Sequence, residues 1–306
     1  MTYHVPVMLN ETTELLLKNL SGTYFDGTLG FGGHSSNFLK QLDSNSKIIA
    51  TDKDVAAINY CENLFLGENR VTIYNSSFTE IKNISLMEGI IAYDGIFADL
   101  GVSSFQFDNV ESGFTYREEA DLDLRMNKSI GEPAYKFINS AEADEIADVI
   151  YKYGEERNSR KIARQILVER KKKFIKTTTQ LKEIIQKIVP VKNLNKTLSR
   201  VFQALRIYVN NELDELKLFL EKSVELLNEG GRIVILSYHS LEDRIVKDFF
   251  KYESLSCICP PEVPVCVCEK KSRLQIVTRK PIIASDIEIK NNPRSRSAKL
   301  RAAQKI

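Results

Sequence analysis

Residues 24–35 read Tyr-Phe-Asp-Gly-Thr-Leu-Gly-Phe-Gly-Gly-His-Ser, and this stretch decides the fold. The apolar run that ends in Asp26 predicts a strand, and the glycines after it predict a tight turn whose backbone approaches a ligand closely. Ser35 opens a segment with helical spacing. The first N–H groups of a helix are unpaired and attract an anion. The stretch therefore predicts a strand, a ligand-binding turn and a helix in succession.

The glycine spacing excludes two common phosphate-binding turns. Counted from Gly30, the dinucleotide fingerprint G-x-G-x-x-G needs its third glycine at Ser35, and the Walker loop needs Gly-Lys-Ser/Thr. An acid followed by a glycine loop is left, which is the pattern of enzymes that use S-adenosylmethionine (SAM). The alternative interpretation is a tight turn without a ligand.

Around this unit the first hundred residues alternate between expected strands and expected helices, which predicts a parallel sheet with helices on both faces. The expected strands are 24–26, 47–52, 71–74 and 93–100, and the expected helices are 9–17, 35–42 and 55–65. From about residue 132 to residue 210 the pattern is helical without a convincing strand. The alternation then resumes with helix 212–227, a stop at Gly230-Gly231, strand 232–236, helix 241–250 and strand 274–278.

We therefore predict an α/β fold, with a doubly wound and mostly parallel sheet, that carries an inserted all-helical subdomain. Residues 1–110 and 208–290 are expected to form the cofactor-binding domain. Residues 111–207 are expected to form a loop and a helical insert that recognises the substrate. Residues 291–306 are expected to be a basic C-terminal tail and the part of the chain most prone to disorder.

Composition limits the class of protein. The 306 residues are 43% hydrophobic and 27% charged, which excludes a wholly disordered or fibrous chain. No apolar run approaches the roughly 20 residues that span a bilayer, and the first ten residues lack a secretory pattern. We expect a cytoplasmic protein that does not enter a membrane. The sequence does not decide between a monomer and a homodimer.

The formal net charge of +2 hides two basic segments. Residues 155–175 hold eight basic and three acidic side chains, and residues 290–306 hold six basic side chains and no acid. Such segments attract a polyanion, although solvated helix faces and a frayed tail explain them equally simply.

Three further positions are candidates for ligand contacts. Asp52 follows the second strand, where an acid meets ribose hydroxyls in doubly wound folds; its alternative role is to cap the next helix, for which Asp54 competes. Phe78, after the third strand, stacks on adenine or belongs to the core. Asp99 ends the fourth strand, where the reacting group of a SAM enzyme is expected.

Six blocks of the sequence together span residues 4 to 301, which is nearly the whole chain. They are His4–Val7, Gly32–His34, Asp94–Gln106, Arg200–Ile207, Ser237–Arg244 and Asn292–Arg301. In this order, the blocks resemble the RsmH (MraW) family of bacterial 16S ribosomal RNA cytosine-N4 methyltransferases.

The resemblance implies a class I SAM-dependent methyltransferase, Rossmann-like in fold. It implies that SAM is the cofactor and that 16S rRNA, in the small ribosomal subunit, is the partner. It also implies that the methylated group is the exocyclic amine of one cytosine at the decoding centre (P site). The implied SAM contacts are Gly32, Gly33, His34, Asp52, Phe78, Asp99 and Gln106.

The chain departs from the family pattern in the loop after the fourth strand. The family's Arg-Gly-Phe reads Ser112-Gly113-Phe114, its Gly-Pro-Leu-Asp reads Ala120-Asp121-Leu122-Asp123, and its Arg-Met-Asp reads Arg125-Met126-Asn127. These changes bear on the substrate contacts of the loop and leave the SAM-binding blocks intact.

The expected chemistry assigns catalytic roles to two residues. A cytosine amine is a poor nucleophile, so an acceptor that orients its N–H bond is useful, and Asp99 is the obvious acceptor. His239 follows the fifth strand and is a candidate general acid/base or base contact; a satisfied structural histidine is the alternative. A DNA amino-methyltransferase is the nearest rival function, but the Pro-Pro-aromatic motif of those enzymes is missing after Asp99. A non-enzymatic RNA-binding protein would not need acids at three strand ends.

A flipped or single-stranded base must be held by contacts to the surrounding RNA. The candidate RNA-facing residues in the insert are Arg157, Arg160, Lys161, Arg164, Arg170, Lys171, Lys172 and Lys173, and those in the tail are Arg294 and Arg296.

Four of the five cysteines fall within 12 residues, as Cys257-x-Cys259 and Cys266-x-Cys268. Four thiolates hold zinc in many proteins, but the usual spacing is C-x₂-C. We therefore assign no metal ligand from the sequence, and zinc binding stays an open alternative.

Overall fold

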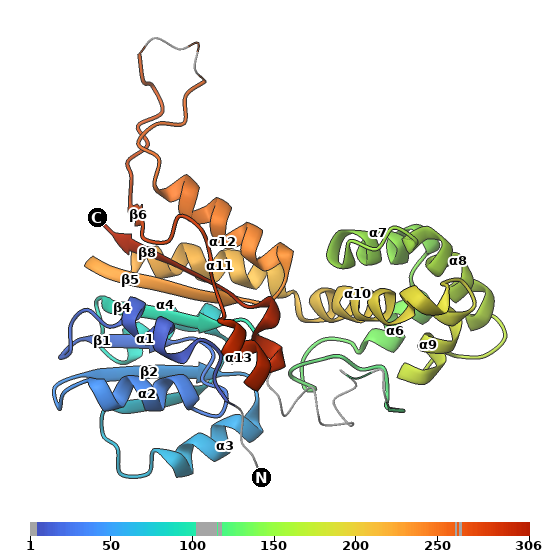
Figure 1. The fold of residues 1–306 in the computed structure, drawn as a ribbon, viewed down its shortest axis with the longest axis horizontal. Coiled ribbons are helices and arrows are strands. Elements are labelled where there is room, and N and C mark those ends of the chain that lie inside the picture. The colour runs from blue at the N-terminus through green and yellow to red at the C-terminus, as the bar shows by residue number, and fades with distance from the viewer. Residues whose placement is uncertain (1–4, 102–114, 116–117, 261, 263–264) are drawn as a thin grey trace. The chain divides into compact units, whose positions relative to one another are not determined.

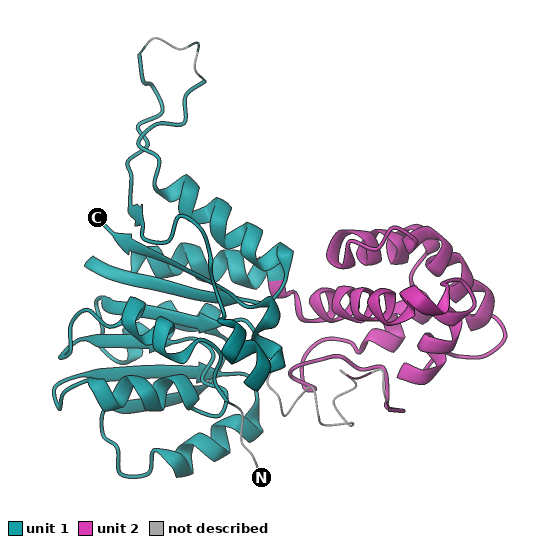
Figure 2. Ribbon diagram, in the orientation of Figure 1, with its two compact units in different colours: residues 1–101, 213–306 teal, residues 102–212 magenta. Residues whose placement is uncertain are grey.

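The computed structural model describes residues 5–101, 115, 118–260, 262 and 265–306. It divides the chain into two compact units, residues 1–101 with 213–306, and residues 102–212 (Figure 2). The sequence placed these divisions near residues 110 and 208. Gln106, one of the expected SAM contacts, lies outside the described residues, as do His4 and the Ser112-Gly113-Phe114 block.

The first unit is built on one sheet with the strand order β3-β2-β1-β4-β5-β8-β6, and β7 also pairs with β8 (Figure 1). Strands β1 to β5 run parallel, whereas β8 runs antiparallel to β5 and to β6. The strands are β1 (Thr23–Asp26), β2 (Lys47–Asp52), β3 (Val71–Asn75), β4 (Tyr93–Asp99), β5 (Leu227–Ser237), β6 (Leu274–Ile276), β7 (Ile282–Ile283) and β8 (Lys299–Lys305). The predicted doubly wound, mostly parallel sheet is confirmed.

Helices cover both faces of this sheet, because alternate residues of each strand point to opposite faces and both sets are apolar. In β4, Phe97 packs into one core cluster while Ile96 and Ala98 pack into the other. Helices α1 (Leu9–Leu16), α2 (Gly33–Gln41) and α3 (Val55–Leu64) contribute to the first cluster. Helices α4 (Ile81–Met87), α11 (Glu212–Glu225) and α12 (Ser240–Glu253) contribute to the second.

From the sequence we expected the glycine pair Gly230-Gly231 to stop the preceding helix. This expectation is wrong. Helix α11 ends at Glu225 and β5 begins at Leu227, so that Gly230 and Gly231 lie inside the strand. Gly230 has a φ of +79°, and the pairing of β4 with β5 shifts register between Tyr93 and Gly95. The glycines therefore form an irregularity inside the strand, where a positive φ is required.

The expectation that residues from 291 onward form a disordered tail is wrong. After α13 (Asp286–Asn291) and the short 3₁₀ helix η3 (Pro293–Ser297), the chain enters β8, which lies between β5 and β6. Leu300 and Ala302 pack into one core cluster and Ala303 into the other. The alternation of small apolar residues with basic ones is the pattern of a strand, and the count of charges concealed it.

The second unit is helical, as predicted. Its helices are α6 (Ala134–Ser140), α7 (Ala143–Gly154), α8 (Ser159–Arg170), α9 (Thr178–Gln186) and α10 (Val191–Asn210). They enclose a separate core that includes Ile150, Ile162 and Leu198, each fully buried. Among the described residues of this unit, the only β-type pairing is an isolated bridge between Asp121 and Thr177.

Candidate functional site

The turn after β1 is held by backbone hydrogen bonds to the two neighbouring strands. The N–H of Gly27 donates to the carbonyl of Phe97 in β4 (2.8 Å), and the N–H of Leu29 donates to the carbonyl of Thr51 in β2 (2.9 Å). These bonds fix the turn at the carboxyl edge of the sheet, which is where ligands bind in open α/β folds. The sequence interpretation of residues 24–35 as strand, turn and helix is confirmed.

Two glycines at the end of the turn are required by their surroundings. Gly32 is the N-cap of α2 with a φ of +75°, a conformation that favours glycine. A Cβ on Gly33 would lie 2.3 Å from Cγ of Pro6. The segment before α1 therefore packs directly on the start of α2, and Gly33 permits that approach. No side chain caps α2, so its first N–H groups are available to an anion.

The side chain of His34 does not face the edge of the sheet. Its Nε2 lies 3.1 Å from the carbonyl oxygen of Val7, and its ring lies 4.7 Å from the ring of Phe97. Burial lowers the pKa of His34 to about 4, although the hydrogen bond to Val7 opposes this shift. The imidazole is thus a neutral core group that joins α2 to the N-terminal segment. Only the backbone of His34 is available for a ligand at the start of α2.

Asp52 ends β2 and holds the turn with its carboxylate. Oδ2 accepts from the N–H of Gly30 (2.7 Å) and Oδ1 accepts from the N–H of Asp54 (2.8 Å). Asp54 caps α3 by accepting from the N–H of Ala56 (2.9 Å), so the expected competition for the cap is resolved in favour of Asp54. Burial raises the pKa of Asp52 above its ordinary value, partly offset by the backbone N–H groups.

Asp26, the last residue of β1, is buried beneath the turn. Its Oδ2 accepts from the hydroxyl of Ser35 (2.6 Å) and its Oδ1 accepts from the N–H of Thr28 (3.1 Å). Burial raises the pKa of Asp26 to about 7, and the nearby carboxylates of Asp52 and Asp99 raise it further against the two hydrogen bonds. The site therefore concentrates acidic groups, which favours a ligand with positive charge.

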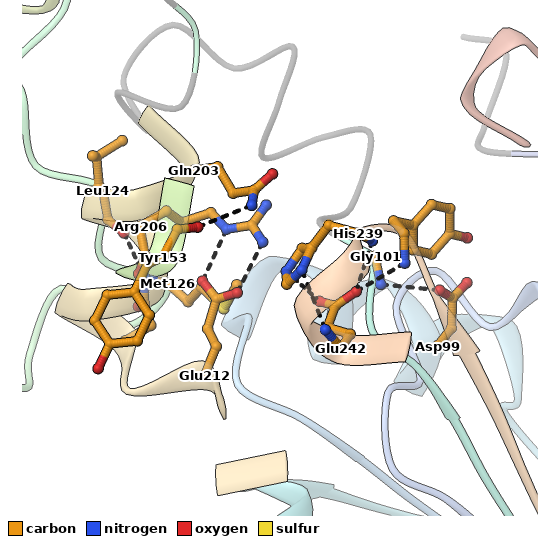
Figure 3. A network of polar contacts seen from close by, with 12 residues as sticks. Asp99, Gly101, Leu124, Met126, Tyr153, Gln203, Arg206, Glu212, His239 and Glu242 are labelled. Atoms are coloured by element: carbon orange, nitrogen blue, oxygen red, sulfur yellow. Dashed lines mark hydrogen bonds and ion pairs between the residues drawn. The ribbon is translucent and has the colours of Figure 1, made fainter. Parts of the chain in front are cut away.

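Asp99 ends β4 at the same edge of the sheet. Its backbone N–H donates to the hydroxyl of Thr28 (2.6 Å), and its Oδ1 accepts from the N–H of Gly101 (3.0 Å). Figure 3 shows this contact. The ring of Tyr238 lies beside the Asp99 side chain, and burial and the Asp99 carboxylate together raise the pKa of the phenol. A Cβ on Gly101 would lie 2.7 Å from Cε2 of Tyr238, so the glycine leaves room for the ring.

Tyr238 is the principal site residue that the sequence analysis missed. Burial raises its pKa well above the ordinary value, and the negative charge of Asp99 adds to the shift, so the phenol stays protonated. Tyr238 stands inside the Ser237–Arg244 block, next to the singled-out His239. The motif therefore contained Tyr238, but the role of this residue depends on its proximity to Asp99, which is distant in sequence and lies in the neighbouring strand.

His239 is the N-cap of α12. Its Nδ1 accepts from the N–H of Glu242 (3.3 Å), while the Glu242 carboxylate accepts from the backbone N–H of Tyr238 (2.8 Å) and of His239 (3.3 Å). Nε2 of the ring lies 3.0 Å from Oε1 of Glu242. Figure 3 shows this pair at the start of the helix. The histidine thus has a structural task in addition to any contact with substrate.

Phe78 follows β3, at the first position of the 3₁₀ helix η1 (Phe78–Glu80). Its ring packs edge-on against Phe219 at 4.7 Å, and the Nζ of Lys53 lies 6.0 Å from the ring centroid. Lys53 is in turn paired with Glu215. The ring is half-buried, with one part supported by α11.

The basic residues proposed to face RNA fall into two groups. Arg157, Arg160, Lys161 and Arg164 are exposed at the start of α8, opposite its buried face. By contrast, Nη1 of Arg170 donates to the carbonyls of Ile138 (3.0 Å) and Ala141 (2.6 Å), so Arg170 closes the end of α6. Lys172 is exposed and paired with Glu169. Lys171 and Lys173 are exposed as well, and like the first group they have no ion pair among the described residues.

The basic residues near the C-terminus are mostly engaged inside the first unit. Lys299 and Arg301 both pair with Asp243 of α12, at 3.0 Å and 2.6 Å, and Lys305 donates to the carbonyl of Val224 (2.6 Å). Arg296 is exposed. It lines an open pocket of about 240 Å³ together with residues that include Tyr238, His239 and Lys299.

The family departures that the structure describes lie in the second unit. Ala120 exchanges hydrogen bonds with Thr178 at the start of α9, and Asp123 forms a bidentate pair with Arg125 (2.6 and 2.9 Å). At the end of α10, the side chain of Asn210 accepts from the N–H of Met126 (2.8 Å) and donates to the carbonyl of Leu124 (2.7 Å). Figure 3 shows these loop residues beside α10. The described part of the loop is therefore anchored by local polar contacts.

The helices that the structure describes include none that is long and apolar enough to cross a membrane.

The donor set fits SAM. Free N–H groups at the start of α2 suit its carboxylate, the acid that ends β2 suits its ribose, and the acidic surroundings suit its ammonium and sulfonium charges. The strand order, with one antiparallel strand between β5 and β6, completes the arrangement. The fold is that of a class I SAM-dependent methyltransferase, and the groups at this edge of the sheet fit SAM.

Comparison with known proteins identifies the family. The model of the MraW methylase family matches residues 1–306. The ribosomal RNA small subunit methyltransferase H of Caldicellulosiruptor saccharolyticus is 47% identical over 304 residues, which cover 99% of each chain. The protein of the same name from Clostridioides difficile is 44% identical over 308 residues, again 99% of each chain. A solved structure of a putative rRNA-methylase from Clostridium thermocellum covers 99% of this chain and 100% of its own, with a TM-score of 0.46 and 12% identity. This chain belongs to the MraW methylase family.

Proposed function

We propose that this protein methylates small-subunit ribosomal RNA, and that the target is the N4 amine of one cytosine at the decoding centre (P site). The relatives that match over 99% of their length are named ribosomal RNA small subunit methyltransferase H, which supports the substrate class. The cytosine and its location rest on the sequence blocks shared with the family. The expected place of action is the cytoplasm, where small subunits are assembled.

The contact between Asp99 and Tyr238 carries the proposed chemistry. SAM supplies an activated methyl group on its sulfonium. The lone pair of a cytosine amine is delocalised into the ring, so the enzyme must hold the amine in line and accept a hydrogen bond from its N–H. Asp99 accepts from the N–H of Gly101, and a carboxylate accepts about four hydrogen bonds in all, so accepting one from the amine is within its capacity. Asp99 then orients the amine and stabilises the positive charge that develops on nitrogen.

The proposed SAM contacts follow from the same edge of the sheet. Gly33 and His34 bind the SAM carboxylate through backbone N–H groups at the start of α2, and Gly32 sets the direction of that helix. Asp52 accepts hydrogen bonds from the ribose hydroxyls with its remaining lone pairs. Phe78 contacts the adenine with its exposed part. Gln106 stays a prediction from the sequence.

The pocket beside Tyr238 supports the placement of the RNA. It is lined by Tyr238, the neighbour of Asp99, and by the exposed Arg296, whose charge suits a phosphate. We propose that it receives a part of the RNA strand next to the target base.

The decisive experiment incubates the purified protein with labelled SAM and small subunits that lack the modification, and maps the modified nucleotide by mass spectrometry. We expect one N4-methylated cytosine at the decoding centre. Label in DNA, or at another atom or position in the rRNA, would overturn the assignment. Asp99→Asn should lose most of the turnover while it still binds SAM. RNA binding without any transfer would leave a non-enzymatic binding protein.

A second experiment tests the exposed patch on α8. Replacing Arg157, Arg160 and Arg164 with glutamine should weaken binding to small subunits and lower the slope of log affinity against log salt by about two, since each phosphate contact contributes about 0.7. The control replaces Lys82, Lys136 and Lys217, which are exposed but paired with acids, and removes the same charge. Equal salt slopes in the two triple variants would leave the patch without a phosphate contact.

A further inference from the structure

The segment between α12 and β6, residues 254–273, is a long connection without a core of its own. Figure 1 shows it leaving the end of α12 and returning to β6 as two extended arms. No described residue of this segment is buried, and Ile258, Val265 and Val267 are 45%, 71% and 74% exposed. A stretch of this size with its apolar side chains in water lacks the hydrophobic burial that orders a chain. An ordered conformation of this segment therefore requires another kind of interaction.

The base of the segment is closed by polar contacts. The N–H of Arg273 donates to the carbonyl of Glu253 (2.8 Å), and the hydroxyl of Ser272 donates to the carbonyl of Ser254 (3.2 Å). The buried carboxylate of Glu253 also pairs with Nε of Arg273 (2.5 Å). These contacts fix where the two arms start, but they do not reach the part beyond residue 257.

Beyond the base, the four cysteines of the two C-x-C pairs meet. Their Sγ atoms all lie within 4.8 Å of one another. The separations are 4.0 Å between Cys259 and Cys266, 3.5 Å between Cys266 and Cys268, and 3.8 Å between Cys268 and Cys257. A disulfide needs about 2.0 Å between sulfurs. Four thiolates around zinc at about 2.3 Å form a tetrahedron with edges of about 3.8 Å, which these distances match.

The backbone around the cysteines points N–H groups at the sulfurs. The N–H of Ile258 lies 3.3 Å from Sγ of Cys268, that of Cys259 lies 3.4 Å from Sγ of Cys257, and that of Val267 lies 3.4 Å from Sγ of Cys259. Such contacts stabilise the negative charge of thiolate ligands. They come from both arms, so the C-x-C spacing, which the sequence analysis regarded as atypical for zinc, brings all four sulfurs to one point.

We propose that Cys257, Cys259, Cys266 and Cys268 bind one zinc ion that orders residues 254–273. The four thiols lose their protons to water as the metal binds, and the resulting site carries a formal charge of −2. A complete tetrahedron of thiolates has no open position, so the zinc is structural and takes no part in methyl transfer.

Elemental analysis of the full-length, untagged protein tests the proposal, after dialysis against zinc and removal of the excess. We expect about one zinc per chain, and loss of the metal in the double variant Cys266→Ser/Cys268→Ser. The control is Cys61→Ser, which removes the fifth thiol, buried in the first unit, and should keep the zinc. Less than a tenth of an equivalent in the wild type, or equal zinc in the double variant, would overturn the proposal.

Two further measurements exclude other states of the four sulfurs. Intact mass under non-reducing conditions should show no loss of hydrogen, whereas a mass lower by four hydrogens indicates two disulfides and contradicts the zinc site. One iron per chain in place of zinc would contradict it as well. Trypsin should cleave after Lys270 and Lys271 several-fold faster once a chelator removes the metal, and at the same rate in the double variant with or without chelator. Melting curves and SAM binding of the double variant confirm that the rest of the unit is folded.

Discussion

The ring of Tyr238, the residue directly after β5, lies beside the side chain of Asp99, at the end of β4, and burial and the Asp99 carboxylate together raise the pKa of the phenol. The two strands are neighbours with Asp99 opposite Leu236, so the contact joins the carboxyl ends of adjacent parallel strands. It leaves Asp99 fixed in orientation before any substrate arrives.

We expect Tyr238→Phe to lower the kcat of methyl transfer by roughly 10-fold to 100-fold, because a hydrogen bond to a charged group contributes about 1.5–3 kcal/mol. The Kd for SAM, measured by calorimetry, should change less than twofold. An unchanged kcat would show that the orientation of Asp99 does not depend on the phenol.

His239 has a capping task that can be separated from a role in the reaction. Asparagine is a good N-cap, whereas alanine is not. His239→Ala should lower the stability of the protein by about 1 kcal/mol in thermal unfolding, and His239→Asn should keep it. If the imidazole contacts the base, both variants lose turnover. Turnover near the wild-type value in His239→Asn would leave the residue a cap alone.

Asp52→Asn should weaken SAM binding by roughly 10-fold to 100-fold, since the charged acceptor for the ribose hydroxyls is lost. The matched control is Asp54→Asn, two residues away, which removes the same charge from a helix cap and should leave the SAM affinity unchanged. Equal losses in the two variants would point to a general effect of charge.

Asp26 makes the stability of the SAM-free protein depend on pH. Its pKa is raised from 3.8 to about 7 by burial, so the folded state binds the proton more tightly than the unfolded state does. The contribution of this proton to the free energy of unfolding is fully present below pH 4 and is lost as the pH rises to 7. The change is on the order of 4 kcal/mol. Denaturant unfolding of Asp26→Asn should therefore show its stability, relative to the wild type, rising between pH 4 and pH 8. A difference that stays constant over this range would contradict the raised pKa.

The sequence predicted the parts of the fold that depend on local pattern. Strands that end in Asp26, Asp52 and Asp99, and the glycine turn between β1 and α2, carry their signal in consecutive residues. Strand β8 does not, because Leu300, Ala302 and Ala303 are its only apolar residues and three of the other four are basic.

The site was predicted less completely, since partners are set by tertiary contacts. Arg301 and Arg170 counted equally as positive charges in the sequence, yet one pairs with Asp243 and the other donates to carbonyls at the end of α6. His34 matched a family motif, but its ring belongs to the core. Tyr238 acquires its role only through a residue 139 positions earlier in the chain.

The position of β8 has a consequence for synthesis. Arg232 pairs with Gln304 and Leu236 with Leu300, so β5 has no partner on one side until residues 299–305 have left the ribosomal exit tunnel. During that interval an apolar strand presents open hydrogen-bonding groups to other nascent chains. Mutations or fusions that delay the arrival of these residues should therefore reduce the soluble yield. The reduction should be larger than that caused by mutations elsewhere that lower the stability of the folded protein by the same amount.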